Sequence, residues 1–495
     1  MRLFPMNLGQ ARTRLVQGGV ALGAVALIAG CGSTYRPVVT PVTPSGPSAQ
    51  PSSYAVVVSS PSPTTPGVAT IIDYSGDSVL AEAPIGNGPL TFTIDELGGT
   101  GYTVNSDGTL TNFPISSSLQ QKQESYSTLP STAQPVNLFS PSAGFYAADS
   151  TGNVADVFSG YPQSFKLAIP VAVNPVMMVG PAVSGQRIFA ISQGNIASGM
   201  DCNNSPTTGP IGAVNGIERS SNTLSSNIPV GKCPVYGVES YDTKRLFILN
   251  RGDDTVTVIN SQNNTPDACT PFVNQNGQTV HCHPTLPLST SAVAATGVTP
   301  PNGTAGMTAT AGPVYAEFVQ ATGELVVANY DAGTISVIDV SEDEYGNDSS
   351  TFGTTFTIPV GNNPASVTVL ADGTRAYTAN QTDQTVTIVD LSSHSVEKTL
   401  PITGHPRTVV STQNSQYGKV YVASPDSPYL SIIRTDLDIL DTTVLVEGNI
   451  VDVRVTTQTG SSGNANITSR RPGYGQPCYL PSTTATSLDV CRTLP

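Results

Sequence analysis

After about residue 54 the chain consists of short runs in which apolar and polar residues alternate. One complete unit has four such runs, at Ala365–Leu370, Ala376–Asn380, Thr385–Asp390 and Ser395–Ile402. A two-residue period built from β-branched and aromatic residues is typical of strands, and the Asp372-Gly373 pair between the first two runs predicts a hairpin. Because no stretch past residue 53 carries a helical stripe, the pattern predicts an all-β protein.

The four-run unit is repeated along the chain, and each copy begins with a turn followed by a proline. The marker prolines are Pro89, Pro135, Pro175, Pro234, Pro313, Pro364 and Pro406, and an eighth turn places Asn449 at the marker position. A repeat of about forty residues, with occasional insertions, indicates one four-stranded sheet per copy. Such sheets arranged radially form a β-propeller, a fold that hides most strand edges.

The two ends of the repeat region predict how the ring closes. Tyr54–Val58 matches a second strand of the unit, Val68–Asp73 a third and Ser78–Ile85 a fourth. Ile450–Val455 has no later strands of its own and supplies the missing innermost strand. We therefore expect a propeller over residues 54–457 with one blade assembled from both ends. The count favours eight blades, and seven if one weak copy merges with its neighbour.

The unit resembles the YVTN β-propeller repeat of bacteria. The matching residues are Tyr377–Asn380, Thr334–Asp339 and Pro359–Pro364, which follow that family's Tyr-Val-Thr-Asn, Thr-Val-Ser-Val-Ile-Asp and Val-Gly-x-x-Pro elements. The resemblance covers about residues 54–457 and is weak in blades 2 to 4, counted from the N-terminus. It implies a bacterial propeller of a group that includes lactonase-like proteins, dehydrogenase subunits and surface-layer components.

The first 30 residues read as a targeting segment, with Arg2, Arg12 and Arg14 before a short apolar run. The run ends in Leu27–Cys31, which resembles the bacterial lipobox and implies lipidation of Cys31; the alternative is an ordinary secretory signal with a chance cysteine. Residues 31–53 are rich in Pro, Ser and Thr and read as a tether. We expect a lipid anchor in a bacterial cell envelope, with the body facing the periplasm or the cell surface.

Six further cysteines agree with export, because persistent disulfides need an oxidising compartment. Proximity favours the pairs Cys202–Cys233, Cys269–Cys282 and Cys478–Cys491 among the fifteen pairings that six cysteines allow. The repeat alignment supports the first pair independently, since it places both cysteines on one face, the top. It places Cys269 and Cys282 in a connection between third and fourth strands, on the opposite face. The last pair lies in an irregular tail, residues 458–495.

The net charge of −14 with only 11% charged residues argues against nucleic acid as a partner. No later apolar run is long enough to span a bilayer, and we expect a monomer.

The turns before the marker prolines should share the top face, where their side chains could form a ligand-binding rim. These candidates are Asn87, Gln134, Asn174, Lys232, Asn363, His405, Glu447 and Asn449. The alternative is that they only satisfy backbone groups of the turns, and this reading has the greater weight.

Three other motifs have simple structural readings. His281-Cys282-His283 offers metal-type ligands, but Cys282 has a disulfide partner nearby. The acidic segment Glu342–Glu344 lacks the spacing of a calcium loop, and Arg251-Gly252-Asp253 falls in a turn.

No catalytic constellation is visible, and we assign no catalytic residues, metal or cofactor. The favoured function is a non-catalytic binding or scaffolding module that engages an envelope protein, peptide or glycan through its top face. An enzyme of the lactonase or redox type and a structural surface-layer component are the alternatives.

Overall fold

The computed structural model of the protein describes residues 53–456 except 96–97, 116–124, 131–132, 134, 143, 161–162, 181–186, 198–199, 201, 203–205, 274–276, 278, 289–309 and 413. The expectations for the signal segment, Cys31, the tether, Gln134, the tail and the Cys478–Cys491 pair lie outside the described residues.

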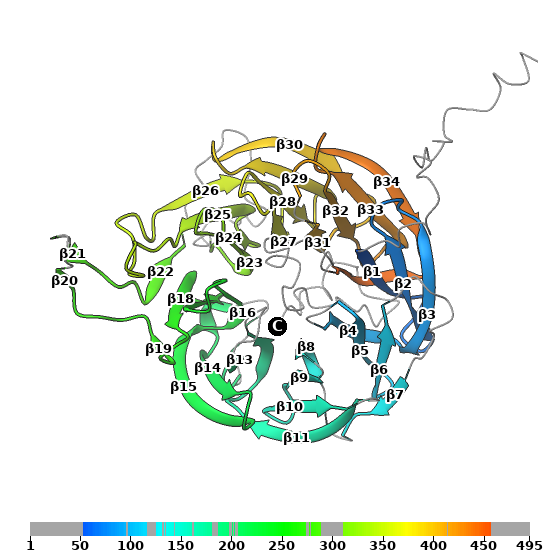
Figure 1. Ribbon diagram of the computed structural model, residues 1–495, viewed down its shortest axis with the longest axis horizontal. Helices are drawn as coiled ribbons and strands as arrows, with labels where there is room; N and C mark the ends of the chain where they lie inside the picture. The colour runs from blue at the N-terminus through cyan, green and yellow to red at the C-terminus, as the bar shows by residue number, and fades with distance from the viewer. Residues whose placement is uncertain are drawn as a thin grey trace, which may run out of the picture. The chain divides into compact units, whose positions relative to one another are not determined.

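Eight antiparallel sheets form a ring, as the alternating pattern predicts (Figure 1). We number the blades so that blade 1 is the one assembled from both ends. Blade 1 comprises β35 (Asn449–Val455), β1 (Tyr54–Ser60), β2 (Pro66–Asp73) and β3 (Val79–Asn87), and blade 2 comprises β4 (Pro89–Ile94), β5 (Thr100–Asn105), β6 (Thr109–Pro114) and β7 (Ser125–Thr128). Blade 3 comprises β8 (Pro135–Ser142), β9 (Gly144–Asp149), β10 (Val154–Ser159) and β11 (Ser164–Pro170). Blade 4 comprises β12 (Pro175–Val179), β13 (Arg187–Ser192), β14 (Ile211–Glu218) and β15 (Thr223–Lys232).

Blades 5 to 8 continue the same order from the innermost strand outwards. Blade 5 comprises β16 (Pro234–Glu239), β17 (Arg245–Asn250), β18 (Thr255–Asn260), β19 (Thr265–Pro266) and β22 (Thr285–Pro287), and blade 6 comprises β23 (Pro313–Val319), β24 (Glu324–Asn329), β25 (Thr334–Asp339) and β26 (Thr355–Pro359). Blade 7 comprises β27 (Pro364–Val369), β28 (Arg375–Asn380), β29 (Thr385–Asp390) and β30 (Ser395–Pro401). Blade 8 comprises β31 (Thr408–Ser411), β32 (Lys419–Ala423), β33 (Tyr429–Arg434) and β34 (Ile439–Leu445).

The ring closes where the sequence predicts. Strand β1 pairs antiparallel with β35, with Ala55 opposite Val455 and Val57 opposite Val453. One detail of the alignment is wrong: the register places Ile450, and not Asn449, at the position that proline occupies in the other blades, because Ile450 pairs with the second strand as Pro364 does in blade 7.

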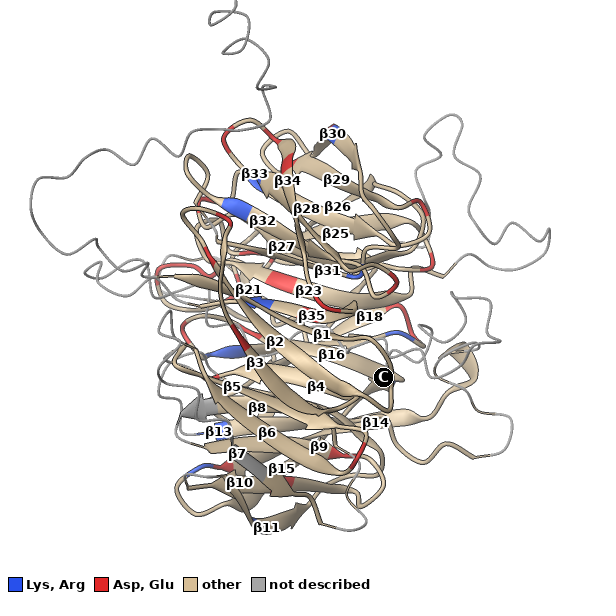
Figure 2. Cartoon of the chain, turned by 90° about the vertical axis from the view of Figure 1, so that its right-hand side faces the viewer, with Lys and Arg blue, Asp and Glu red and all other residues tan. Residues whose placement is uncertain are grey.

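Packing between blades holds the ring together. Tyr377 and Tyr421 are among the largest fully buried side chains, and apolar residues of the inner three strands of each blade fill the spaces between sheets. Burying a side chain of this size contributes about 1.5–3 kcal/mol. Asp and Glu are found mainly in the connections, whereas most strand residues are uncharged (Figure 2).

The recurrent Asn and Thr residues of the repeat form a hydrogen-bonded pair within each well-matched blade. In blade 7 the Nδ2 of Asn380 donates to Thr385 Oγ1 at 3.0 Å and to Thr387 Oγ1 at 2.8 Å. Blades 2, 5 and 6 have the same arrangement, at Asn105–Thr111, Asn250–Thr257 and Asn329–Ser336. This Asn–Thr pair ties the end of the second strand to the third strand.

The insertion that carries Cys269 and Cys282 does not lie in a connection between third and fourth strands, as the alignment predicts. Both β19 and β22 pair with β18, at its two ends, so they are two pieces of one fourth strand. The insertion between them extends outside the ring as the hairpin β20 (Phe272–Val273) and β21 (Thr279–Val280) (Figure 1). The prediction was wrong because each strand piece is too short to show a period.

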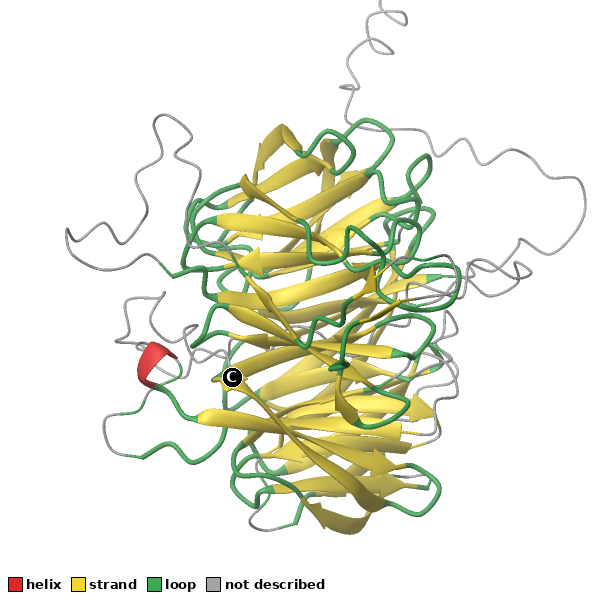
Figure 3. Ribbon diagram, turned by 90° about the vertical axis from the view of Figure 1, so that its left-hand side faces the viewer, coloured by secondary structure: helices red, strands yellow, loops and turns green. Residues whose placement is uncertain are grey.

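Helix is nearly absent from the described residues: Figure 3 shows one short segment, the 3-10 helix η2 (Pro206–Thr208). Within the same residues, no helix is long and apolar enough to cross a membrane.

Candidate functional site at the top of the ring

We define the top face as the one that carries the second-to-third strand connections and the turns that lead into each innermost strand. Those turns need a left-handed residue before the proline, such as Asn174 (φ 57°), Asn363 (φ 55°) or Gly312 (φ 62°). Gly and Asn adopt this conformation at low cost. Cys233 does so as well (φ 47°), and it is held there by its disulfide.

Aspartates of the second-to-third connections lock these turns. In four blades an Asp carboxylate accepts the backbone N–H of a rim turn: Asp107 from Asn87, Asp253 from Lys232, Asp383 from Asn362 and Asp426 from His405, over distances of 2.6–3.0 Å. The Arg251-Gly252-Asp253 segment is one of these connections, which confirms that it is a turn. In these four blades the two kinds of top connection are therefore joined by a hydrogen bond.

The predicted rim residues that the structure describes lie in the top turns, and four of them make side-chain contacts within the propeller. Asn174 Nδ2 donates to Gln193 Oε1 at 3.1 Å, and Asn363 Nδ2 donates to the Tyr330 carbonyl at 3.2 Å. Lys232 Nζ contacts the Thr207 carbonyl at 3.3 Å.

The imidazole of His405 bridges two blades, with Nδ1 at 2.6 Å from Asp426 Oδ2 and Nε2 at 3.1 Å from Gln384 Nε2. Asn87 is half-buried, while Glu447 and Asn449 are exposed. The contacts of Asn174, Lys232, Asn363 and His405 favour the interpretation of these four rim residues as turn chemistry.

A disulfide fixes the insertion between β13 and β14 to the top of the ring. Cys202 and Cys233 are both buried and bonded, with their Cα atoms 5.4 Å apart. A Cβ on Gly209 would lie 1.8 Å from Cys233 Sγ, so only glycine fits there. The alignment predicted this bond because it placed both cysteines on one face.

Four exposed apolar residues belong to the top connections of blade 4, which include the insertion that this disulfide holds. They are Val173, Ile196, Met200 and Ile211, which are 44%, 44%, 39% and 67% exposed. We call these four residues the top patch. The Gly194 N–H donates to the Val173 carbonyl at 3.0 Å, which connects the insertion to the rim turn. Exposed apolar surface of this kind marks interaction sites when it is contiguous.

Another feature of the top face is a row of four residues in blades 4 to 7. In each of these blades, the residue is the first one after the second strand. These residues are Gln193, Arg251, Tyr330 and Gln381, all buried, and we call them the polar arc. The Arg251 guanidinium lies over the Tyr330 ring at 5.6 Å, and Tyr330 Oη donates to Gln381 Oε1 at 3.0 Å. Each of these contacts joins one blade to the next.

Arg407 occupies a register position that is apolar in the other seven blades. The equivalent residues, each directly after the proline position, are Leu90, Val136, Val176, Val235, Val314, Ala365 and Val451. Arg407 is only 4% exposed, and its Nη1 has no hydrogen-bond partner among the described residues. Burial lowers the pKa of Arg407 to about 9, although Asp452 opposes this effect.

Asp452 and Arg454 lie on β35, the neighbouring innermost strand. Arg454 Nη2 is 2.5 Å from Asp452 Oδ2, and both residues are buried. Burial raises the pKa of Asp452 to about 6 against the lowering effect of Arg454. Sequence reasoning missed Arg251, Arg407, Asp452 and Arg454, although comparing the residues after each marker proline would have singled out Arg407.

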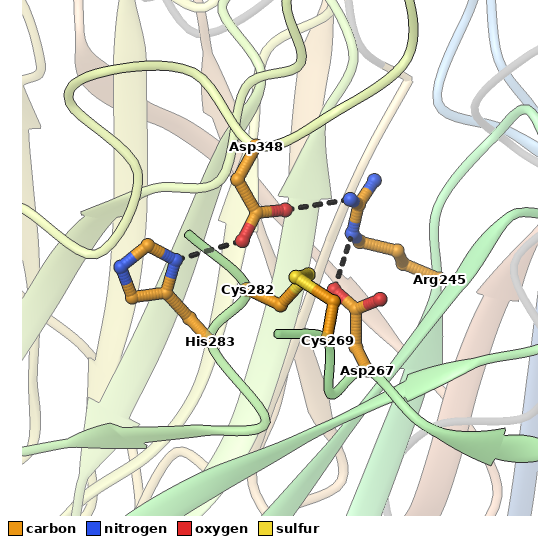
Figure 4. Close-up of a disulfide and its surroundings, with 6 residues drawn as sticks. All are labelled: Arg245, Asp267, Cys269, Cys282, His283 and Asp348. Carbon is orange, nitrogen blue, oxygen red and sulfur yellow. Dashed lines mark hydrogen bonds and ion pairs between the residues drawn. A yellow bond between two sulfur atoms is a disulfide. The ribbon is translucent and has the colours of Figure 1, made fainter. Parts of the chain in front are cut away.

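On the opposite face an ion cluster joins blades 5 and 6 next to the exposed disulfide Cys269–Cys282 (Figure 4). Arg245 contacts Asp267 at 3.1 Å and Asp348 at 2.6 Å, and it also pairs with Glu342. His283 Nδ1 lies 2.7 Å from the second oxygen of Asp348. These five residues are the blade 5–6 ion cluster.

The cluster shifts the pKa values of its members. Burial lowers the pKa of Arg245, but its three carboxylate partners raise it overall. Burial raises the pKa of Asp348 and outweighs the effects of His283 and Arg245.

The structure also places the two metal-type motifs. Cys282 is bonded to Cys269, and His283 belongs to the blade 5–6 ion cluster. In the acidic segment Glu342 pairs with Lys244 and Arg245, while Asp343 Oδ1 accepts the backbone N–H groups of its own turn. Among the described residues, no group of three or more His, Cys, Asp and Glu side chains is arranged to hold a metal ion.

The fold and the top face define an eight-bladed β-propeller. No family model and no curated protein matches the chain. Solved structures with this fold include AztD from Citrobacter koseri (TM-score 0.52, 12% identity, covering 81% of this chain and 97% of that one). Dihydro-heme d1 dehydrogenase NirN, solved in complex with DHE, gives a TM-score of 0.55 at 14% identity, with 85% and 79% covered.

Sqt1 of Saccharomyces cerevisiae is similar as well (TM-score 0.51, 10% identity, 74% and 87% covered). At these identities the likeness shows the fold alone.

Proposed function

We propose that this protein is a lipid-anchored, non-catalytic binding module of the YVTN propeller type, displayed in a bacterial cell envelope. It engages a partner protein, peptide or glycan with its top face. The anchor at Cys31 and the tether over residues 31–53 are the sequence observations behind the location. The two disulfides Cys202–Cys233 and Cys269–Cys282 agree with an oxidising compartment.

The top patch is the observation that carries the binding role. Its four apolar side chains are exposed, so leaving them in water needs a reason beyond folding. The Cys202–Cys233 disulfide holds the insertion in place before any partner arrives. A pre-ordered surface loses less conformational freedom on binding. The apolar character favours a protein or peptide partner over a glycan.

Capture from solubilised envelope extract tests this proposal. We expect the full-length protein to retain a specific partner, and Ile196→Ser combined with Ile211→Ser to reduce its capture strongly. Leu437→Ser is the matched control, because Leu437 is 56% exposed in a connection on the opposite face. Undiminished capture by the double variant, or equal loss with Leu437→Ser, would refute a role for the top patch.

A further inference from the structure

We infer that the exposed disulfide Cys269–Cys282 is a reversible thiol–disulfide exchange site for a dithiol, and that its redox state controls the contact between blades 5 and 6. The site lies on the opposite face from the top patch, so it goes beyond the proposed docking of a partner. The inference rests on the position of the two cysteines relative to the blade 5–6 ion cluster.

The disulfide joins the two ends of the insertion at the point where both enter the ion cluster. Asp267 stands two residues before Cys269, and His283 directly follows Cys282. Both side chains belong to the cluster (Figure 4). The two cysteines are bonded with their Cα atoms 5.5 Å apart. The crosslink therefore limits how far the two cluster residues of the insertion can separate.

These two residues hold the contact with blade 6. Asp348, in the β25–β26 connection of blade 6, lies 2.6 Å from Arg245 Nη2 and 2.7 Å from His283 Nδ1. The His283 ring also stacks on Phe352 of the same connection, with ring centroids 5.1 Å apart. Arg245 Nε donates to Asp267 at 3.1 Å. Blade 5 thus contacts blade 6 through Arg245, which Asp267 orients, and through His283.

Short strand pieces hold the two ends of the insertion beside the disulfide. Strands β19 and β22 have two and three residues. The hairpin β20–β21 pairs Phe272 with Val280 and Val273 with Thr279. A two-stranded hairpin is marginally stable in water by itself. Opening the disulfide therefore removes a covalent link from ends that are otherwise held by very short strands.

Access favours exchange at this disulfide over the other one. Cys269 is exposed and Cys282 is half-buried, whereas Cys202 and Cys233 are both buried. A thiolate must reach a sulfur atom to exchange with it, and exposed disulfides are the ones that serve as labile or regulatory bonds. The exposed sulfur of Cys269 is the one that an incoming thiolate attacks.

The exchange transfers two electrons from the dithiol to the protein. One thiolate of the dithiol attacks Cys269 Sγ, the S–S bond to Cys282 breaks, and Cys282 leaves as a thiolate that takes up a proton. The second thiolate of the dithiol then attacks its partner sulfur in the mixed disulfide and releases Cys269, which is protonated in turn. The protein is reduced to two thiols, and the dithiol is oxidised to a disulfide.

Coupling between the disulfide and the ion cluster acts in both directions. Where opening the disulfide weakens the contact between the blades, weakening that contact eases reduction by the same factor. The test therefore uses two independent perturbations, one at the cluster and one at the cysteines.

The first experiment equilibrates the full-length protein in detergent with mixtures of reduced and oxidised dithiothreitol. Alkylation and peptide mass spectrometry measure the reduced fraction of Cys269 and Cys282. We expect His283→Ala and Arg245→Met each to reach half reduction at a reduced-to-oxidised ratio at least about fivefold lower than the unaltered protein. His283→Ala is expected to fold, because it leaves Arg245 with its carboxylate partners.

Arg375→Met is the matched control. Arg375 is the first residue of the second strand of blade 7, as Arg245 is in blade 5, and it pairs with Asp438 of blade 8. This variant breaks an ion pair between blades but leaves the blade 5–6 ion cluster intact. Its half-reduction ratio for Cys269–Cys282 should match that of the unaltered protein.

The second experiment measures hydrogen exchange after the crosslink is removed. Cys269→Ser combined with Cys282→Ser imitates the reduced state. We expect amide exchange in residues 339–353 to become at least about fivefold faster. This segment includes the Ser349 N–H, which donates to the Ser341 carbonyl at 3.1 Å. Exchange in the strands of blade 8 should be unchanged.

Three results would overturn the inference. The first is a half-reduction ratio that is the same in both cluster variants as in the unaltered protein. The second is unchanged exchange of residues 339–353 in the double serine variant. The third is a shift in Arg375→Met as large as that in His283→Ala, because the effect would then come from general loss of stability.

Discussion

Asp156 of β10 lies beside Asp149 at the end of β9. At this place, four other blades have an Asn amide that donates a hydrogen bond to a Thr or Ser hydroxyl. The charge of Asp149 acts on Asp156, and both side chains are buried. Blade 7 has Asn380 and Thr387 at these positions. Blade 3 therefore replaces a neutral hydrogen-bonded pair of the repeat with two carboxylates.

This pair makes blade 3 sensitive to pH. Burial raises the pKa of Asp156 to about 7, and the charge of Asp149 adds to the effect. A carboxyl whose pKa is raised by folding contributes stability at low pH, below its unfolded pKa of about 4, and loses it as pH rises through the folded value. We expect Asp156→Asn to raise the free energy of unfolding by about 2–4 kcal/mol at pH 8 and much less at pH 5.

Urea denaturation at the two pH values measures this difference. Asp390→Asn is the control with the opposite sign, because hydrogen bonds from Ser392 and Ser393 lower the pKa of Asp390. A gain at pH 8 no larger than the gain at pH 5 would show that Asp156 does not titrate in this range.

Removing the Asn–Thr pair should destabilise a well-matched blade. Asn380→Ala leaves the hydroxyls of Thr385 and Thr387 without their donor, and Thr387 is fully buried. We expect a loss of about 1–3 kcal/mol in the free energy of unfolding. Asn362→Ala, in an exposed turn of the same blade, should cost less. Similar losses for the two variants in thermal and urea unfolding would contradict this explanation of the motif.

The blade 5–6 ion cluster depends on Arg245. Replacing Arg245 with Met leaves Asp267, Asp348 and Glu342 together without their shared cation. Breaking a buried ion pair from one side costs about 3–5 kcal/mol. The exposed pair Arg434–Asp436 is the comparison, and Arg434→Met should cost about 0–1 kcal/mol. Urea unfolding that ranks the two variants equally would show that the cluster contributes little.

The two disulfides should differ in their reactivity towards reductants. Cys269 is exposed and Cys282 half-buried, whereas Cys202 and Cys233 are both buried. Because thiol–disulfide exchange needs access to a sulfur atom, mild reduction followed by alkylation and peptide mass spectrometry should label Cys269 and Cys282 first. Earlier labelling of Cys202 and Cys233 would mean that the top insertion opens readily in solution.

The sequence was informative wherever a structural feature repeats. The marker proline and the Asn–Thr pair act within one blade, so each copy strengthens the prediction of the others. The same reasoning predicted the pairing of Tyr54–Val58 with Ile450–Val455, because the incomplete first copy needs an innermost strand. It also predicted the Cys202–Cys233 bond, which depends only on which face each connection occupies.

Features that occur once, or that join two blades, were not predictable in this way. Arg245 and Asp348 are 103 residues apart and meet only because neighbouring blades stack in one register. The division of a fourth strand into Thr265–Pro266 and Thr285–Pro287 leaves pieces too short for any period to be seen. Arg407 could have been found as the single charged residue at an otherwise apolar position, but its buried state required the structure.

The pairing of β1 with β35 has a consequence for biosynthesis. Strand β1 emerges early from the ribosome, yet Val455, which pairs with Ala55 of β1, lies 400 positions later in the chain. Until β35 has been synthesised, the inner edge of β1 has unpaired backbone N–H and C=O groups that could pair with a strand of another chain. A chain of this design therefore reaches its final stability only after β35 has been synthesised and has covered that edge.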